Sequence, residues 1–279
     1  MPDKCGETYP VDATDARNMF DQIGSAEFIK RNAFYKETYG GLYFDVSPSG
    51  MINAYSMRLN DSIREELAKE VPTVNWGKYV GIICIHAGML RWITVVATVC
   101  EYIDRTHKLG DAKRMLKWAA ERLTRFSAGS DFVTRFVDEF GVECDGQREE
   151  IVRMYGMGLL VYLYGHEIGH SCLHHNSFGL HSLSRNNECQ ADLFASSLIQ
   201  SMGMGYVGAI GAVMLMLSFI WEGGRFSRYM TKEELKNPSK YDTHPESIER
   251  LVKLIESFNT ILDRAPINTK QLMKLAKKG

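Results

Sequence analysis

Residues 159–170 place two histidines and a glutamate inside a strongly apolar stretch. The motif His166-Glu167-Ile168-Gly169-His170 is preceded by the apolar residues Leu159, Leu160, Val161 and Leu163. A helix that is apolar nearly all round is buried, and burying these polar groups without partners is unfavourable. Histidines at i and i+4 lie on the same side of a helix, where they can share a zinc ion at about 2.0 to 2.1 Å. The segment therefore predicts a buried helix with zinc ligands His166 and His170 and with Glu167 as general base.

A catalytic zinc site normally takes three protein ligands, so we expect a third ligand downstream of the motif. The spacing HExxHxxGxxH is excluded, because the chain has Leu173 and Asn176 at the required positions. A helix-like stretch opens near residue 187 and contains Glu188 and, four residues later, Asp192. We expect Glu188 to be the third ligand. Asp192 lies one turn on, where its carboxylate can accept the free ring N–H of a ligand histidine.

The remaining histidines and two cysteines near the motif are not expected to bind the metal. His174 continues the i+4 series, but a further helical turn carries its side chain about 6 Å along the axis, too far to join the same tetrahedron. We expect His174, His175 and His181 to lie behind the ligands or at the surface, and His86 and His107 to be structural. Cys172 and Cys189 lack a CxxC partner and are predicted to be small buried residues.

The motif together with the downstream carboxylates resembles the gluzincin metallopeptidases, in which HExxH is followed by a glutamate ligand and an aspartate four residues on. The sequence also contains His244-Pro245 and, six residues after the histidine, Arg250. This resembles the HPxxxxR signature of the CAAX-processing and HtpX-like gluzincins. The resemblance implies that His244 stabilises the oxyanion of the tetrahedral intermediate and that Arg250 holds His244 in place. His244 is also a plausible start of a helix, with Thr243 as N-cap.

Further resemblances concern the N-terminal half of the chain and the motif. Residues 49–57 resemble the NAF/NAY strand of the same gluzincins, and residues 79–85 with 88–90 resemble the edge strand and helix that follow it. Edge strands in these enzymes bind extended peptides by β-addition. The chain is also similar to the bacterial phage-exclusion (Lit-like) peptidases, and the run from His166 to His175 to the ImmA/IrrE-type peptidases.

Charge and cysteine content bear on the partners and the location of the protein. The formal net charge is −1, which gives no electrostatic reason for nucleic-acid binding. The basic run Lys113, Arg114, Lys117, Arg122 and Arg125 alternates with apolar residues at helical spacing, as a solvated helix face does. The six cysteines have no regular spacing and the N-terminus lacks the apolar run of a signal peptide, so we expect a cytoplasmic protein.

Residues 203–221 contain no charged side chain and are long enough in principle to cross a bilayer. The segment is interrupted by glycines, which weaken an isolated helix and favour close packing. We expect a buried helix behind the metal site and keep membrane association as a less favoured alternative.

The expected fold is α+β and mainly helical, a zincin fold with a small N-terminal sheet over the active-site helix. We expect one domain over residues 1–279, with the sheet in residues 1–110 and the zinc-binding helical part in 111–279. Strands are expected at 42–46, 51–57 and 79–85, and a glycine turn at Gly40-Gly41. Helices are expected at 13–35, 88–104, 111–126, 130–140, 147–172, 188–201, 206–221, 232–235 and 245–263. Residues 176–187, between the expected helices 147–172 and 188–201, are expected to form an exposed loop.

The leading hypothesis is a zinc-dependent endopeptidase that acts on a protein or peptide substrate. His244 would assist the oxyanion, with Tyr155, Tyr229 or Tyr241 as candidate partners. A zinc-binding regulatory or interaction protein and a membrane-associated processing protease are the alternatives.

Overall fold

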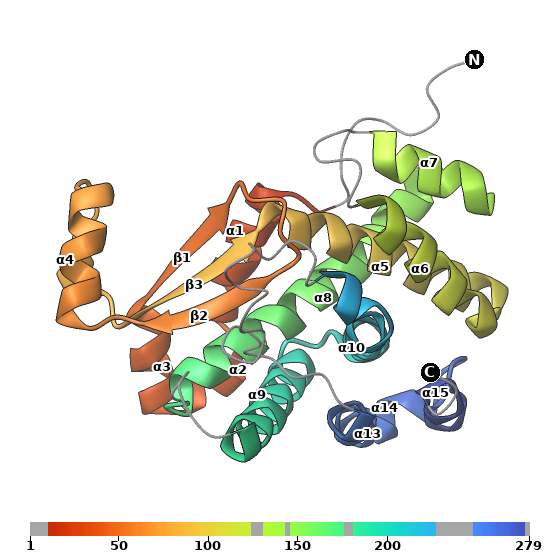
Figure 1. Cartoon of the computed structure of the whole chain (residues 1–279). Helices are drawn as coiled ribbons and strands as arrows, with labels where there is room; N and C mark the ends of the chain where they lie inside the picture. The colour runs from red at the N-terminus through yellow and green to blue at the C-terminus, as the bar shows by residue number, and fades with distance from the viewer. Residues whose placement is uncertain (1–10, 124–130, 143–145, 176–180, 227–247, 277–279) are drawn as a thin grey trace.

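A computed structural model describes residues 11–123, 131–142, 146–175, 181–226 and 248–276. Three strands form one sheet near the N-terminus, and helices make up most of the remainder (Figure 1). The expectation of a mainly helical α+β fold is confirmed. One cluster of buried apolar residues has members from Val11 to Leu272, so the sheet and the helices share a core.

The sheet contains β1 (Leu42–Ser47), β3 (Gly81–His86) and β2 (Ala54–Arg58) in that order, with β1 parallel and β2 antiparallel to β3. Every residue of β3 is buried. Ile83 and Ile85 face the main core, whereas Ile82 and Cys84 face a second, smaller cluster with Trp76.

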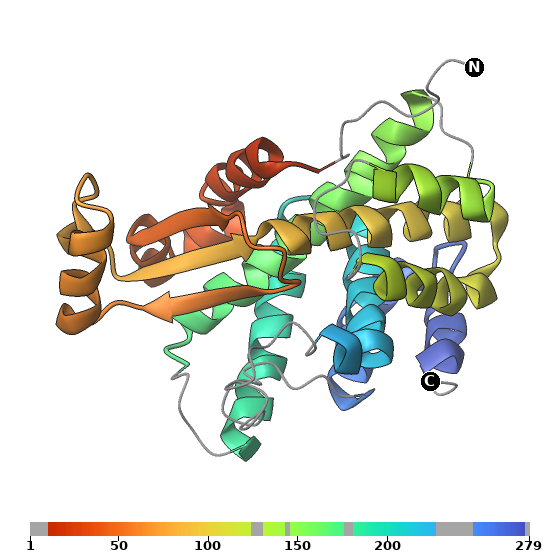
Figure 2. The ribbon, with the colours of Figure 1, turned by 45° about the horizontal axis from the view of Figure 1, so that its top comes forward.

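The sequence resemblance placed the edge strand at residues 79–85, and this is wrong. The strand in that segment is β3, which lies between the other two strands and is covered on its two faces by the two apolar clusters. The edge strand facing the helical part is β2, which contacts the motif helix (Figure 2).

The helices before and between the strands are α1 (Ala13–Ile23), α2 (Glu27–Arg31), α3 (Ala33–Gly40) and α4 (Asp61–Glu70). The expected helix over residues 13–35 is thus divided twice. Ala26 adopts an extended conformation before α2. Asn32 adopts one before α3, which it caps by accepting from the N–H of Tyr35. Helix α4 was not predicted. It buries none of its residues, so it carries little hydrophobic periodicity. It lies beyond one end of the sheet (Figures 1 and 2).

The remaining helices are α5 (Ala87–Thr106), α6 (Ala112–Leu123), α7 (Asp131–Phe140), α8 (Gly146–Cys172), α9 (His181–Ser201), α10 (Gly205–Phe226), α13 (Ile248–Ser257), α14 (Asn259–Leu262) and α15 (Thr269–Ala276). Short 3-10 turns occur at Trp76–Lys78 and Leu109–Asp111. The expected helix at 232–235 lies outside the described residues.

Two boundaries differ from expectation. Helix α9 begins at His181, so the second half of the expected loop is helical. The polar residues 181–187 gave no apolar periodicity from which to predict this. The last expected helix, 245–263, is divided between α13 and α14, and α15 was not predicted.

Helix α8 is the centre of the molecule, with α9, α5, α10 and α1 packed around it and β2 and β3 across it (Figure 1). Helix α10 is long and apolar enough to cross a membrane, and 67% of its most apolar window is buried inside the protein. Residues 209–217 are fully or almost fully buried against the neighbouring helices, as expected of a core helix.

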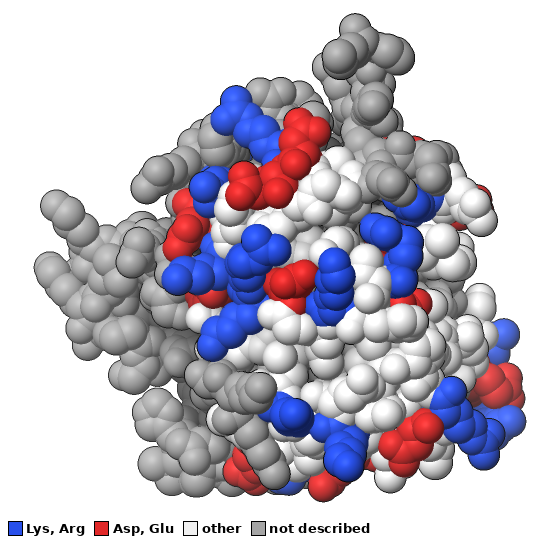
Figure 3. All heavy atoms as spheres, turned by 90° about the vertical axis from the view of Figure 1, so that its right-hand side faces the viewer, with Lys and Arg blue, Asp and Glu red and all other residues white. Residues whose placement is uncertain are grey.

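Helix α6 carries the predicted basic run. Lys113, Arg114 and Lys117 are exposed, and Ala112, Met115, Leu116 and Ala119 are buried. On the face that includes α6, acidic and basic side chains alternate without forming a field of one sign (Figure 3). The interpretation as a solvated helix face is confirmed for these residues.

Candidate metal centre

Helix α8 brings the rings of His166 and His170 together. The two residues are one helical turn apart, and their Nε2 atoms lie 3.1 Å from each other. The rings are nearly perpendicular, with centroids 4.7 Å apart and an angle of 83°. Both Nε2 atoms therefore point to one place beside the helix.

Helix α9 supplies the third donor. The carboxylate of Glu188 lies 3.3 Å from His166 Nε2 through Oε2 and 3.4 Å from His170 Nε2 through Oε1. Three donors bound at about 2.0 to 2.1 Å to one tetrahedral ion lie about 3.3 Å from each other. The spacing of these donor groups matches that triangle. Among the described residues, His166, His170 and Glu188 form the group that could hold a metal ion.

Two glycines set the distance between α8 and α9. A Cβ atom on Gly165 would lie 2.8 Å from Ala195 Cα, and one on Gly169 would lie 3.2 Å from Ala191 Cα. Both glycines are on the side of α8 that faces α9. Their missing side chains allow the helix backbones to approach closely enough for Glu188 to reach the two histidines.

Asp192 lies behind His166, as the sequence predicted. Its Oδ1 lies 2.9 Å from His166 Nδ1. Because a carboxylate oxygen accepts, His166 Nδ1 donates and Nε2 keeps its lone pair for a metal. Tyr162, one turn before His166, donates its hydroxyl to the same oxygen at 2.8 Å. This tyrosine was not anticipated, although its i−4 position relative to His166 could have suggested it.

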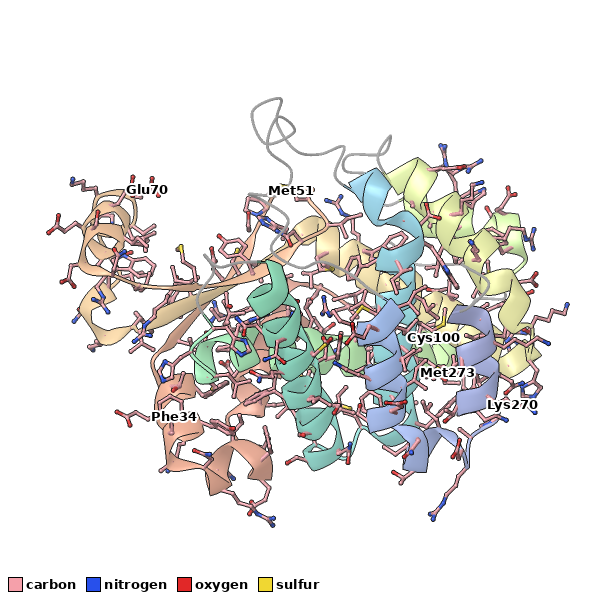
Figure 4. The ribbon with its side chains drawn as sticks, turned by 60° about the horizontal axis from the view of Figure 1, so that its bottom comes forward. Phe34, Met51, Glu70, Cys100, Lys270 and Met273 are labelled. Carbon is pink, nitrogen blue, oxygen red and sulfur yellow. The ribbon has the colours of Figure 1, made fainter. Side chains whose placement is uncertain are left out.

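Arg250 joins the site from α13, which packs beside α9 (Figure 4). Its Nε and Nη2 atoms donate to Asp192 Oδ2 and Oδ1 at 2.8 and 2.9 Å, and its Nη1 lies 3.0 Å from Glu188 Oε2. Arg250 was expected to hold His244, and residue 244 lies outside the described residues. In the structure Arg250 contacts the candidate ligand Glu188 and the carboxylate of Asp192.

The charges at this site favour a cation. Three carboxylates, those of Glu167, Glu188 and Asp192, and one guanidinium, that of Arg250, are buried together. When all four are ionised, two negative charges remain, which a divalent ion would neutralise. Burial alone would lower the pKa of His166, but its contacts with Asp192 and Glu188 raise that pKa to about 10. The negative charges that raise the pKa of this ring also favour a cation beside its Nε2 atom.

The Asp192 carboxylate stays ionised within the protein. Burial alone would raise the pKa of Asp192, but the Arg250 guanidinium and the His166 ring hold it well below its usual range. An ionised Asp192 is the form that accepts hydrogen bonds from both His166 and Tyr162.

The second ligand histidine has a different neighbour. His170 Nδ1 lies 3.0 Å from His175 Nδ1, and His175 Nε2 lies 3.0 Å from Gln190 Oε1. The sequence predicted His175 either behind the ligands or at the surface. The structure places it behind His170. His174 is exposed. Its Nδ1 lies 3.4 Å from Arg58, and its ring is tilted by 51° against that of Phe34.

The structure describes two of the other candidate site residues, Glu167 and Tyr155. Glu167 is 2% exposed on the motif helix between the two ligands. Tyr155 was a candidate to assist the oxyanion, and this is corrected: its hydroxyl donates to Asp104 at 3.0 Å, and Tyr155 precedes His166 by about 16 Å along the helix. The positions of His244, Tyr229 and Tyr241, and the side chain of His181, lie outside what the structure describes.

The residues expected to be structural behave as such. Cys172 and Cys189 are buried and free. His86 is buried at the junction of β3 and α5, and His107 ends α5 in a left-handed conformation.

Fold and site together define a mainly helical α+β protein with a buried His-His-Glu group that could hold a metal ion. The family model of Peptidase U49 matches residues 96–269, which is more than half of the chain and includes all of the site residues described above. The chain belongs to the Peptidase U49 family and is a peptidase. Neither curated proteins nor solved structures give a match.

The family match confirms the expectation of a peptidase. The closer resemblance to HtpX-like and Lit-like gluzincins remains a prediction.

Proposed function

We propose that the chain is a zinc-dependent endopeptidase, with His166, His170 and Glu188 as metal ligands and Glu167 as general base. The observation that carries the proposal is the triangle of donor groups at 3.1, 3.3 and 3.4 Å. Bound zinc supplies Lewis acidity, which polarises a peptide carbonyl and makes a water molecule more acidic.

The protein's own side chains carry the proton steps. Glu167 takes a proton from the attacking water and passes it to the nitrogen of the leaving amine. Asp192 keeps His166 in the tautomer whose Nε2 is unprotonated, and Arg250 holds Asp192 and Glu188 in position. His244 is our candidate for stabilising the oxyanion, as the sequence resemblance implies.

We further propose that a protein or peptide substrate binds in extended form beside β2. This strand has β3 on one side and contacts α8, the helix that carries the motif. Its last residue, Arg58, reaches His174, one turn beyond His170. A substrate strand added here would pass close to the ligands. We propose a cytoplasmic location, with a membrane-associated processing protease as the alternative that the apolar helix α10 supports.

The proposal is tested by comparing new protein N-termini in cells that express the wild-type chain or the Glu167→Gln variant. Glu150→Gln, an exposed glutamate on the same helix, is the matched control. We expect cuts with the wild-type and control chains and a loss of at least about 10²-fold with Glu167→Gln, while bound zinc measured on the purified variants stays equal. Cuts that persist in zinc-loaded Glu167→Gln would contradict the mechanism. A folded, zinc-loaded wild-type chain that produces no cuts would favour the regulatory zinc-binding protein.

A further inference from the structure

The end of α8 turns back on itself immediately after the ligand His170. His174 adopts φ 54°, a left-handed conformation that is uncommon in residues other than glycine. The N–H of His175 donates to the carbonyl of His170 at 3.0 Å, and the N–H of His174 approaches the carbonyl of Ser171 at 3.4 Å. This pair of bonds is the Schellman arrangement. It returns the chain so that His175 lies beside His170 and does not continue along the helix axis.

The protons along the contact between these side chains can be assigned. A metal at His170 Nε2 requires that nitrogen to be unprotonated, so the ring proton of neutral His170 is on Nδ1. His175 Nδ1, 3.0 Å away, must then accept. Neutral His175 consequently carries its proton on Nε2 and donates it to Gln190 Oε1, also at 3.0 Å. The opposite orientation of the Gln190 amide would place a proton on both facing Nδ1 atoms, and they would repel.

We propose that His175 and Gln190 form a relay that fixes the tautomer and ring orientation of the ligand His170. His175 and Gln190 are positioning residues, and the proposal rests on the metal site proposed above. Ligand histidines usually donate their second ring N–H to a carboxylate, a backbone carbonyl or water. His166 follows this rule through Asp192, whereas His170 has a neutral histidine in that place.

The relay adds a third residue of α9 to the surroundings of the site. Glu188 and Asp192 lie one turn apart on α9 and reach His166 and His170 directly, whereas the exposed Gln190 between them contacts His175. Glu188 is a ligand, Asp192 orients His166, and Gln190 acts on His170 through His175. A single helix thus supplies one ligand and orients the other two.

The experiment measures zinc affinity by competition with a chelator and ring tautomers by NMR of the full chain labelled with 15N-histidine. His175→Leu removes the acceptor and keeps most of the volume. His175→Asn retains an acceptor oxygen close to the position of Nδ1. Gln190→Leu removes the end of the relay from an exposed position, and Gln200→Leu is its matched control at another exposed position of α9.

We expect His175→Leu to weaken zinc binding by about 10- to 100-fold and His175→Asn to restore most of it. Gln190→Leu should weaken binding more than Gln200→Leu does, and wild-type His175 should carry its proton on Nε2. Zinc affinity of His175→Leu within twofold of the wild type, or a proton on His175 Nδ1 in the neutral wild-type ring, would overturn the relay.

The tautomers of His170 and His175 are read in the zinc-loaded chain. A wild-type chain that fails to bind zinc would overturn the proposed function and the relay together, whereas zinc binding by the wild type that His175→Leu leaves unchanged would overturn the relay alone.

Discussion

Arg250 binds Asp192 through two parallel hydrogen bonds, from Nε at 2.8 Å and Nη2 at 2.9 Å, and both side chains are almost completely buried. The pair joins α13 to α9 behind His166. Removing one member of a buried ion pair leaves the other charge without compensation, at a cost of about 3 to 5 kcal/mol.

We therefore expect Arg250→Met to lower the free energy of unfolding by about 3 to 5 kcal/mol, measured by urea denaturation. Lys253→Met is the control, because Lys253 lies on the same helix, is 46% exposed and pairs with Glu249 at the surface. The free energy of unfolding of Lys253→Met should stay close to that of the wild type, because solvent screens a surface ion pair. Equal losses in the two variants would show that the Arg250 pair has no special part in stability.

Tyr162→Phe removes the hydroxyl that donates to Asp192 and leaves the ring in place. The lost hydrogen bond to a charged group should cost about 1.5 to 3 kcal/mol, and zinc binding should weaken because Asp192 is less firmly held. Tyr102→Phe removes another tyrosine–aspartate bond, that to Asp111, and should leave zinc affinity unchanged. If both variants bind zinc as the wild type does, Tyr162 does not support the site.

Gly165→Val tests the close approach of α8 and α9, since a Cβ at this position would lie 2.8 Å from Ala195 Cα. We expect a loss of about 1 to 3 kcal/mol in stability from overpacking. Zinc binding should weaken by about tenfold or more as Glu188 and Asp192 move away. At Gly110 a Cβ would meet nothing within 4 Å, so Gly110→Val is the control. Undiminished zinc affinity in Gly165→Val would mean that the site tolerates a wider helix separation.

Metal removal should lower stability, because the site is assembled only in the folded chain. Zinc at about 100 times its dissociation constant should stabilise the chelator-treated chain by about 2.7 kcal/mol, measured as a rise in Tm. The rise should persist in Glu167→Gln and disappear in His166→Ala. A zinc-induced rise that survives in His166→Ala would place the bound metal elsewhere.

The packing of α10 leads to a prediction about location. Because residues 209–217 are buried against other helices of the protein, we expect the expressed chain to be recovered without detergent. Fractionation followed by a carbonate wash measures this. Recovery only from the washed membrane pellet, and release only by detergent, would support the membrane-associated alternative.

The sequence alone was sufficient to predict the motif helix α8 and the candidate ligands on α8 and α9, because the pattern within each helix depends on local spacing. Histidines at i and i+4 share a face wherever the helix lies, and the same holds for Glu188 and Asp192 on α9. The apolar stretches that became β3, α5 and α10 were also recognisable, since burial leaves a continuous hydrophobic pattern.

Contacts between distant segments depended on the tertiary structure. Arg250 binds Asp192 because α13 packs on α9, and no local pattern records that packing. Packing between distant elements likewise determines the central position of β3 and the close approach of α8 and α9 at Gly165. It also determines the contact between His175 and Gln190. Local spacing determines which side chains share a face, and only the packing of the elements determines what that face meets.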